Sequence, residues 1–271
     1  DALAVYHYVN SCEKGKILAV DIGTNGEILL LNGSRKFACS AAAGPALEGG
    51  AVCCGMRAVK GAIDMVSLNG RFPMEDIVCR VIGEAVPLGI CGSGLMDALA
   101  LLLQTGVLDS NGYMKNSREA KASGVPPRII RRIEEKGERR FLLTDEKHPV
   151  YLTAGDVRQL QLSISAIRSG IEVLLKKAGL ASSELNRIYL AGAFGCYIDI
   201  ESSIKTGLFP KLPTEKILQA GNLAGTGAAM VLLSSHALLK MEKEAGNIVH
   251  VELAEDEEFK ELFLFNMKFV N

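Results

Sequence analysis

The chain has 271 residues, of which 48% are hydrophobic and 23% are charged, and its formal net charge is −1. A chain this apolar and this close to neutral can bury a core, so its composition excludes intrinsic disorder. The 30 Lys and Arg residues are balanced by 31 Asp and Glu residues, which leaves no basic excess for binding a nucleic acid. Glycine is in excess: 28 residues make about 10% of the chain, against a usual value of about 7%.

Neither a membrane segment nor a disulfide framework is predicted. No apolar run approaches the ~18 residues of a membrane-spanning helix, and the first residues do not read as a signal peptide. The seven cysteines are an odd number without a Cys-x-x-Cys pair, which fits no disulfide framework, zinc ribbon or iron–sulfur cluster. We therefore expect reduced thiols and a cytoplasmic protein. Because the sequence starts at Asp1 and not at a methionine, we also expect a piece of a longer protein.

The first predicted unit is a meander of three β-strands. Residues 17–22 (ILAVDI) form an apolar run rich in branched side chains, as expected of a buried strand. Similar runs follow at 27–31 and 34–40. The Asn32-Gly33 pair between them predicts a type I′ hairpin turn, which requires positive φ twice. After the third strand, a glycine-dense stretch is predicted to give way to helix beyond Gly50.

Two short strands and a helix are predicted next. IVCRVIG (77–83) and VPLGI (86–90) read as strands on either side of a turn. The string at 91–106 reads as a helix with a long apolar face. Ser93 is its predicted N-cap, and Gly106 lies where a left-handed C-terminal glycine belongs.

The middle of the chain changes character. Residues 109–150 show little periodicity and contain a charged run of mixed sign, so we interpret them as a solvated insertion, with a binding arm as the alternative. The longest helix is predicted to start at a capping box of Thr153 and Asp156 and to end at Gly179. Its buried stripe has three- and four-residue spacing and comprises Val157, Leu160, Ile164, Ile167, Ile171 and Leu174.

Further strand–helix units complete the chain. RIYLAG (187–192) and KILQAG (216–221) read as short buried strands that each lead into a helix, and IVHVEL (248–253) reads as a last strand. This order predicts an α/β domain with a mixed sheet flanked by helices, similar to the ribonuclease-H-like fold. We expect a first part of this lobe, a small insertion and a second part of the lobe, at residues 1–108, 109–150 and 151–271.

Four glycine-rich turns lie at strand ends or helix starts, at 21–27, 91–94, 192–195 and 221–227. Backbone N–H groups bind phosphate in such turns, because glycine lets the main chain approach closely. Ligands of open α/β sheets gather outside the carboxyl ends of strands. Converging turns therefore predict a phosphate site, while the alternative is that each turn is only a tight connection.

Asp21 is the main candidate for chemistry. It ends a buried strand and precedes Gly23, Thr24, Asn25 and Gly26. A carboxylate there can orient Mg²⁺ or its water ligands, while Thr24 and the N–H groups of the turn reach phosphate oxygens. If Asp21 only caps the turn, asparagine in its place would leave nucleotide affinity nearly unchanged.

Other nucleotide and catalytic motifs are excluded. The chain has no GxxxxGK(S/T) P-loop and no GxSxG elbow. GTGAAM (225–230) and GSGLMD (92–97) come nearest to a dinucleotide fingerprint but lack its third small residue. The histidines are dispersed without metal-ligand spacing, at His7, His148, His236 and His250.

Two motifs point to a known superfamily. DIGTNGE (21–27) resembles a phosphate motif of the ATPases that include actin, sugar kinases and heat-shock chaperones, and LAGAFG (190–195) resembles their adenosine motif. With six further segments in one order, they resemble the C-terminal domain of the ATP-dependent reductive activators of corrinoid proteins. These segments are ACSAAAGPALEGG (38–50), CGMRAVKGAI (54–63), GICGSGL (89–95), DVRQLQLSISAIRSGI (156–171), GLFP (207–210) and GNLAGTGA (221–228).

The resemblance implies an actin-like ATPase lobe with ATP and Mg²⁺ as cofactors. Its family uses ATP to drive an uphill electron transfer that returns cobalt(II) of an inactivated corrinoid protein to cobalt(I). The resemblance further implies a corrinoid protein as partner and a homodimer. An iron–sulfur domain and the superfamily's first phosphate loop would belong to a part of the protein that precedes Asp1.

Roles for single residues also follow only from the resemblance. Asp21 would be the catalytic residue and would hold Mg²⁺ through water. Phosphate would be bound by Gly23, Thr24, Asn25 and Gly26, and adenosine by Gly192, Ala193, Phe194 and Gly195. Neighbouring walls of the nucleotide site would be Gly44, Pro45, Glu48, Gly92, Ser93 and Gly94. Where relatives usually carry a lysine, this chain has Ser163-Ile164, which puts nucleotide affinity in question.

Two hypotheses remain open. The chain is the second lobe of an ATP-hydrolysing reductive activator, inactive by itself because half of the phosphate site belongs to the other lobe. Alternatively, it is a protein-docking or dimerisation module of the same fold that works without nucleotide. A small-molecule kinase lacks support, because neither a substrate pocket nor a catalytic base is evident.

Overall fold

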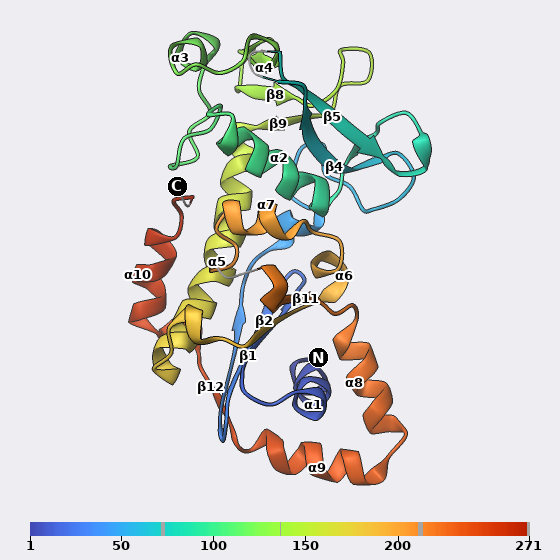
Figure 1. The fold of residues 1–271 in the computed structure, drawn as a ribbon, viewed down its shortest axis with the longest axis vertical. Coiled ribbons are helices and arrows are strands. Elements are labelled where there is room, and N and C mark those ends of the chain that lie inside the picture. The colour runs from blue at the N-terminus through green and yellow to red at the C-terminus, as the bar shows by residue number, and fades with distance from the viewer. Residues whose placement is uncertain (72–73, 136, 211–213, 270–271) are drawn as a thin grey trace. The chain divides into compact units, whose positions relative to one another are not determined.

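A computed structural model describes residues 1–71, 74–135, 137–210 and 214–269, apart from the side chain of Ala193. The chain divides into two compact units (Figure 1). Unit 1 comprises Asp1–Ala43, Ser165–Tyr197 and Phe209–Asn266, and unit 2 comprises Gly44–Ile164, Ile198–Leu208 and Met267–Asn271. Among the described residues, no helix combines the length and the apolar character that crossing a membrane requires.

Unit 1 contains a six-stranded mixed sheet in the order β11-β10-β1-β2-β3-β12. The strands are β1 (Lys16–Ile22), β2 (Gly26–Asn32), β3 (Arg35–Ala41), β10 (Arg187–Ala191), β11 (Ile217–Gln219) and β12 (Ile248–His250). β1, β2 and β3 are antiparallel, whereas β10 is parallel to β1, β11 to β10, and β12 to β3. The predicted meander and mixed sheet are confirmed.

Helices cover both faces of this sheet (Figure 1). On one face, α1 (Ala2–Cys12) packs on β1 and β2 and against α8 (Leu223–Leu232). α1 and α8 touch so closely that a Cβ atom at Gly227 would lie 2.0 Å from the Ala4 carbonyl oxygen. On the other face, the part of α5 (Ala154–Ala178) that belongs to unit 1 packs closely, so that a Cβ at Gly170 would lie 2.7 Å from Ile28 Cδ1. The sequence analysis did not predict α1.

Three further α-helices belong to unit 1 among its described residues. They are α6 (Gly192–Gly195), α9 (Ser235–Ala245) and α10 (Glu257–Phe265). α10 is fixed to α5 at its end, because Asn266 donates hydrogen bonds to Ser169 Oγ at 3.0 Å and to Glu172 Oε2 at 2.9 Å.

The β2–β3 hairpin is present, but its turn is not the predicted one. Asn32 pairs with Arg35, so the two-residue loop is Gly33-Ser34. In this loop positive φ is confined to Gly33, at 60°, which is the pattern of a type II′ turn and not of type I′. The sequence pattern therefore placed the turn one residue too early.

Among its described residues, unit 2 contains two small sheets, four whole α-helices and the first part of α5. β4 (Ala62–Asn69) lies between β5 (Asp76–Val81) and β6 (Gly89–Ile90), and the second sheet has the order β7-β8-β9. The bounds of the second sheet are Ile133–Glu134, Arg140–Leu142 and Tyr151–Thr153. The helices are α2 (Gly92–Gln104), α3 (Ser117–Ala122), α4 (Pro127–Ile130) and α7 (Ile200–Lys205), and α2 packs on both β4 and α7.

Two local predictions in unit 2 are wrong. The helix expected beyond Gly50 is absent: turns lead to β4, because the chain reverses at Gly61 with φ 91° and then presents a half-buried strand. Ser93 is not the N-cap of α2, since Cys91 holds that position. Instead, the Ser93 hydroxyl donates to the Asp64 carbonyl oxygen at 2.8 Å and ties α2 to β4.

Other local predictions are confirmed. Gly106 follows α2 with φ 76°. Thr153 and Asp156 form the reciprocal capping box of α5: the Thr153 N–H donates to Asp156 Oδ2 at 2.9 Å, and the Asp156 N–H donates to Thr153 Oγ1 at 3.0 Å. The predicted apolar stripe of α5 is buried along its whole length.

Candidate functional site

Three of the four predicted glycine-rich turns meet at one cavity in unit 1. Its volume is ≈ 390 Å³. The cavity is lined by the first turn after β1, the residue after β10 and the start of α8: Asp1, Asp21, Gly23, Thr24, Asn25, Glu27, Gly192, Asn222 and Ala224. The turns converge because β1 and β10 are parallel neighbours whose carboxyl ends lie at the same edge of the sheet.

The β1–β2 turn forms one wall of this cavity. Asp21 pairs with Glu27 across the two strands, and only Gly23, Thr24 and Asn25 connect the strands. The Gly23 N–H donates to the Asn25 carbonyl oxygen at 3.0 Å, which closes the turn. A short turn of this kind presents main-chain groups and the Thr24 side chain to a ligand.

Gly192 forms the opposite wall and tolerates no side chain. It has φ 84°, and a Cβ atom would lie 2.5 Å from Asp21 Oδ1 and 2.7 Å from the Ile22 carbonyl oxygen. Its N–H donates to the Gly221 carbonyl oxygen at 3.2 Å, which joins the end of β10 to the segment before α8. Glycine is therefore required here for both conformation and space.

The N-terminus of α8 opens on the cavity. Asn222 is its N-cap, and its side chain accepts a hydrogen bond from the Gly225 N–H at 2.8 Å. Asn222 and Ala224 line the cavity. Because the start of a helix carries partial positive charge, this arrangement favours an anion such as a phosphate group.

Three carboxylates line the cavity, those of Asp1, Asp21 and Glu27, and Asp21 and Glu27 face each other on paired strands. Burial, followed by the nearby Glu27 carboxylate, raises the pKa of Asp21 above its ordinary value. Repulsion between two carboxylates would be relieved by a divalent cation. Mg²⁺ fits this donor set, because it is usually held by one or two carboxylates together with water and phosphate oxygens. No group of three His, Cys, Asp or Glu side chains in the described part of the chain is placed to hold a metal ion.

Of the predicted adenosine segment, Gly192–Gly195, only part lines the cavity. Gly192 lines the cavity, whereas Phe194 is buried and Gly195 accepts a hydrogen bond at its carbonyl oxygen from Gln219 at 3.2 Å. Cys196 Sγ donates to the Gly192 carbonyl oxygen at 2.9 Å and closes the short α6 helix. Ala193 lies in α6, and its side chain is outside the described part of the chain.

The remaining predicted residues belong to unit 2 or to the interior. Gly92, Ser93 and Gly94 form the buried first turn of α2, where a Cβ at Gly94 would lie 2.5 Å from the Ile63 carbonyl oxygen. Gly44 precedes the 3₁₀ turn Pro45–Glu48 of the same unit. Gly26 begins β2 and is buried. Ser163 and Ile164 are buried in α5.

Four residues line the cavity but were not predicted as site residues: Asp1, Glu27, Asn222 and Ala224. The predicted strands, 17–22 and 27–31, would have placed Glu27 opposite Ile22, whereas the observed three-residue connection places it opposite Asp21. Asn222 carried an N-cap signal, because it stands three residues before Gly225 at the start of an apolar helix.

Comparisons with known proteins agree with this architecture. The profile of a family described as the C-terminal domain of RACo, the ASKHA domain, matches residues 15–271. The chain is 36% identical over 263 residues to the corrinoid activation enzyme RamQ of Eubacterium limosum, a match that covers 95% of this chain and 43% of that protein. It is 28% identical over 272 residues to the Co(II) methylated amine-specific corrinoid protein reductase of Methanosarcina barkeri, covering 93% of this chain and 46% of that protein.

A solved structure is also similar. It is described as a reductive activator for corrinoid, iron–sulfur protein, and it matches with a TM-score of 0.83 and 30% sequence identity. The match covers 99% of this chain and 42% of that chain. The chain therefore spans less than half the length of these relatives.

Proposed function

The chain belongs to the family of C-terminal ASKHA domains of RACo, the reductive activators of corrinoid proteins, and from this premise we propose that it binds Mg–ATP as the second lobe of such an activator. The observation that carries the proposal is the cavity where the β1–β2 turn, Gly192 and the α8 N-terminus meet. In the whole protein, ATP hydrolysis would drive the reduction of a corrinoid protein from cobalt(II) to cobalt(I).

Each element of the cavity has a role in this proposal. The β1–β2 turn binds phosphate oxygens through Thr24 and Asn25 at its tip, while Gly23 and Gly26 shape the turn, and the α8 N-terminus adds a favourable dipole. Asp21 holds the metal through water and is the catalytic residue of this lobe. When bound, Mg²⁺ neutralises charge on the phosphates. Gly192–Gly195 lie beside the adenosine, with Gly192 giving the nucleotide room at the end of β10.

The redox step requires more than this chain. Reduction of cobalt(II) to cobalt(I) consumes one electron, and we propose that an iron–sulfur cluster in another part of the whole protein supplies it. ATP hydrolysis in a site shared with a first lobe would shift the docked corrinoid protein towards a reducible state. The chain alone is then expected to bind ATP weakly and to hydrolyse it negligibly.

The names of the relatives support a corrinoid protein as the partner of the whole protein. RamQ is a corrinoid activation enzyme, and the Methanosarcina barkeri relative is a reductase of a corrinoid protein. We propose a corrinoid protein as the partner here also, with the whole protein a cytoplasmic homodimer. The division into residues 1–108, 109–150 and 151–271 stays a prediction.

A docking or dimerisation module without nucleotide is the second candidate. It is favoured by apolar side chains on the surface of α8 and α9: Leu232 and Leu233 are each 86% exposed, and Leu239 is 66% exposed. Under this alternative, Asp21→Ala would leave function intact, while Leu232→Ser with Leu233→Ser would abolish partner binding.

Calorimetric titration of Mg–ATP tests the proposal. We expect weak, saturable binding to the chain, loss of binding in Asp21→Ala, and unchanged binding in the control Asp145→Ala, which lies in an exposed turn of unit 2. A longer protein that includes the first lobe should bind more tightly and turn ATP over. Equal affinity and equal turnover of the two proteins would contradict a site shared between lobes.

A further inference from the structure

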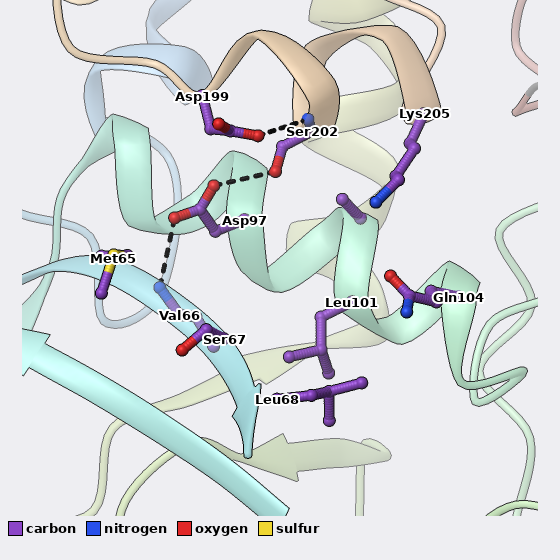
Figure 2. A pocket seen from close by; sticks show the side chains of 11 residues that line it. Met65, Val66, Ser67, Leu68, Asp97, Leu101, Gln104, Asp199, Ser202 and Lys205 are labelled. Atoms are coloured by element: carbon purple, nitrogen blue, oxygen red, sulfur yellow. Dashed lines mark hydrogen bonds between the residues drawn. The ribbon is translucent and has the colours of Figure 1, made fainter. Parts of the chain in front are cut away.

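A second cavity, of ≈ 390 Å³, lies within unit 2 between β4, α2 and α7 (Figure 2). None of its lining residues belongs to the phosphate site described above. Asp97 and Leu101 of α2 form its buried part, while Asp199 and Lys205 at the two ends of α7 are exposed. Leu68 of β4 lines the side that faces Leu101.

The carboxylate of Asp97 is the unusual group in this cavity. Asp97 is only 7% exposed. Its Oδ2 accepts a hydrogen bond from the Val66 N–H at 3.2 Å, and its Oδ1 accepts one from Ser202 Oγ at 2.9 Å, as Figure 2 shows. Both donors are neutral, so the negative charge of Asp97 is hydrogen-bonded but forms no ion pair among the described residues.

The basic residues nearest to Asp97 have other partners. Arg80 forms a bidentate ion pair with Asp64, in which both N–O distances are 2.9 Å. Lys205 Nζ lies 3.7 Å from Glu201 Oε2. Within the described residues, no basic nitrogen forms an ion pair with Asp97. Buried charges are normally paired. An asparagine at position 97 could accept either of the two hydrogen bonds, and it would avoid the cost of burying a negative charge. Asp97 is therefore a buried carboxylate at the wall of a cavity, without an ion-pair partner among the described residues, and a bound cation would neutralise its charge.

We propose that this cavity binds a small organic cation that carries a guanidinium or primary ammonium group. The N–H groups of the cation donate hydrogen bonds to the carboxylates of Asp97 and Asp199, and its aliphatic part packs between Leu68 and Leu101. The volume lies in the range of small-molecule sites, about 300–1,000 Å³.

The lining favours this class of cation over two others. None of the described residues that line the cavity is aromatic, whereas quaternary ammonium groups are typically bound in aromatic cages. A metal ion held by only two carboxylates needs further oxygen ligands such as those of a phosphate, and the described lining residues include no glycine-rich turn that would bind one. Carboxylates that accept hydrogen bonds match a cation with several N–H donors.

Titration of the 271-residue chain with n-butylguanidinium tests the proposal, with n-butylurea as a neutral probe of the same shape. We expect saturable binding of the cation with a dissociation constant of about 1 mM or tighter, and no saturable binding of the urea. Equal binding of both probes would show that the cavity recognises only apolar shape and would overturn the proposal. Absence of saturable binding of the cation would also overturn it.

Three variants locate the binding site. Asp199→Asn keeps the N-cap of α7, because asparagine caps as well as aspartate, and should weaken binding about threefold to tenfold through the lost charge. Asp97→Asn should weaken binding more than about tenfold. Asp145→Asn removes a negative charge outside the cavity and should leave the dissociation constant unchanged. If all three variants bind alike, the cation is attracted only by net charge and the proposal is wrong.

A measurement on the unmodified chain covers the case in which Asp97→Asn does not fold. Burial, and to a smaller extent the Asp199 carboxylate, raise the pKa of Asp97 to about 6. The other charged groups around it are Lys205 of α7, Asp64 of β4 and Arg80 of β5. Affinity for n-butylguanidinium should therefore fall as the pH is lowered through about 6. Constant affinity between about pH 5 and pH 7 would contradict a role for Asp97.

Discussion

The carboxylate of Asp21 occupies the space that a side chain at position 192 would need. A Cβ atom on Gly192 would lie 2.5 Å from Asp21 Oδ1, closer than two unbonded heavy atoms can approach. Asp21 ends β1 and Gly192 follows β10, and these strands are parallel neighbours. The glycine of one motif and the acid of the other therefore depend on each other, although 170 residues separate them in the sequence.

Gly192→Ala should destabilise the chain strongly. The φ of 84° and the contact with Asp21 both oppose a side chain, so we expect a loss of at least about 2 kcal/mol in the free energy of unfolding. Gly195→Ala is the matched control, because its Cβ would lie 3.4 Å from the nearest atom and it stands in a helix. The free energy of unfolding of that variant should lie within about 1 kcal/mol of the value for the unmodified chain. Urea denaturation measures both, and equal losses would contradict the geometry.

Glu27→Gln should have opposite effects with and without Mg–ATP. Like charges directly opposite each other on paired strands are destabilising, and Glu27 raises the pKa of Asp21. A raised pKa in the folded state means that stability is lost as pH rises through that pKa. Removing the Glu27 charge should therefore raise stability at neutral pH by about 0.5 kcal/mol. The variant should also gain less thermal stability from Mg–ATP than the unmodified chain. A larger gain from Mg–ATP in Glu27→Gln would exclude the carboxylate pair from metal binding.

Most strands of the large sheet could be predicted from the sequence because they follow from short-range patterns, and the convergence of their turns follows from the α/β fold. Apolar runs of strand length predicted β1, β2, β3, β10 and β11, and parallel strands bring their carboxyl ends to one edge of a sheet. The helix α1 escaped prediction because Val5, Tyr6 and Val9 favour strands by propensity. They are helical here because they pack on the sheet and α8, a tertiary effect.

The details of the site depend on register and on contacts distant in sequence. Glu27 enters the cavity because it pairs with Asp21, which requires the exact length of the turn. Ser93 bonds to Asp64 and not to its own helix, since β4 passes beside the first turn of α2. This contact requires the strand at residues 62–69, which the sequence analysis did not predict.

Asp97→Asn should remove a pH-dependent loss of stability. The pKa of Asp97 is raised to about 6, so the folded state binds the proton more tightly than the unfolded state, and stability falls as pH rises from about 4 to about 6. The free energy of unfolding of the variant, relative to that of the unmodified chain, should be about 1–2 kcal/mol higher at pH 7 than at pH 4. Solvent screening at the mouth of the cavity keeps this difference below the value that the full pKa shift would give. Denaturation curves at both pH values measure the gain, and a constant difference would contradict the raised pKa.

Ser202→Ala tests the same group by another route. The Ser202 hydroxyl donates to Asp97 at 2.9 Å and lowers its pKa. Loss of this hydrogen bond should move the pKa of Asp97 upward, while the carboxylate stays in place. Carbon-13 NMR titration of the Asp97 carboxyl group measures the shift. A downward shift would show that the hydroxyl does not stabilise the charged form.

Asn222→Ala separates the stability of α8 from nucleotide binding. Asn222 and Ser234 are N-caps of successive helices, accepting from the Gly225 N–H at 2.8 Å and from the Ala237 N–H at 3.2 Å. Replacement of either by alanine should cost about 1 kcal/mol. Only Asn222 lines the phosphate cavity, so only Asn222→Ala should weaken Mg–ATP binding by more than the loss of stability explains. Paired urea denaturation and calorimetry on both variants distinguish the effects. If Ser234→Ala weakens Mg–ATP binding equally, the α8 N-terminus has no special role at the phosphate, because a cap 12 residues away would then matter as much.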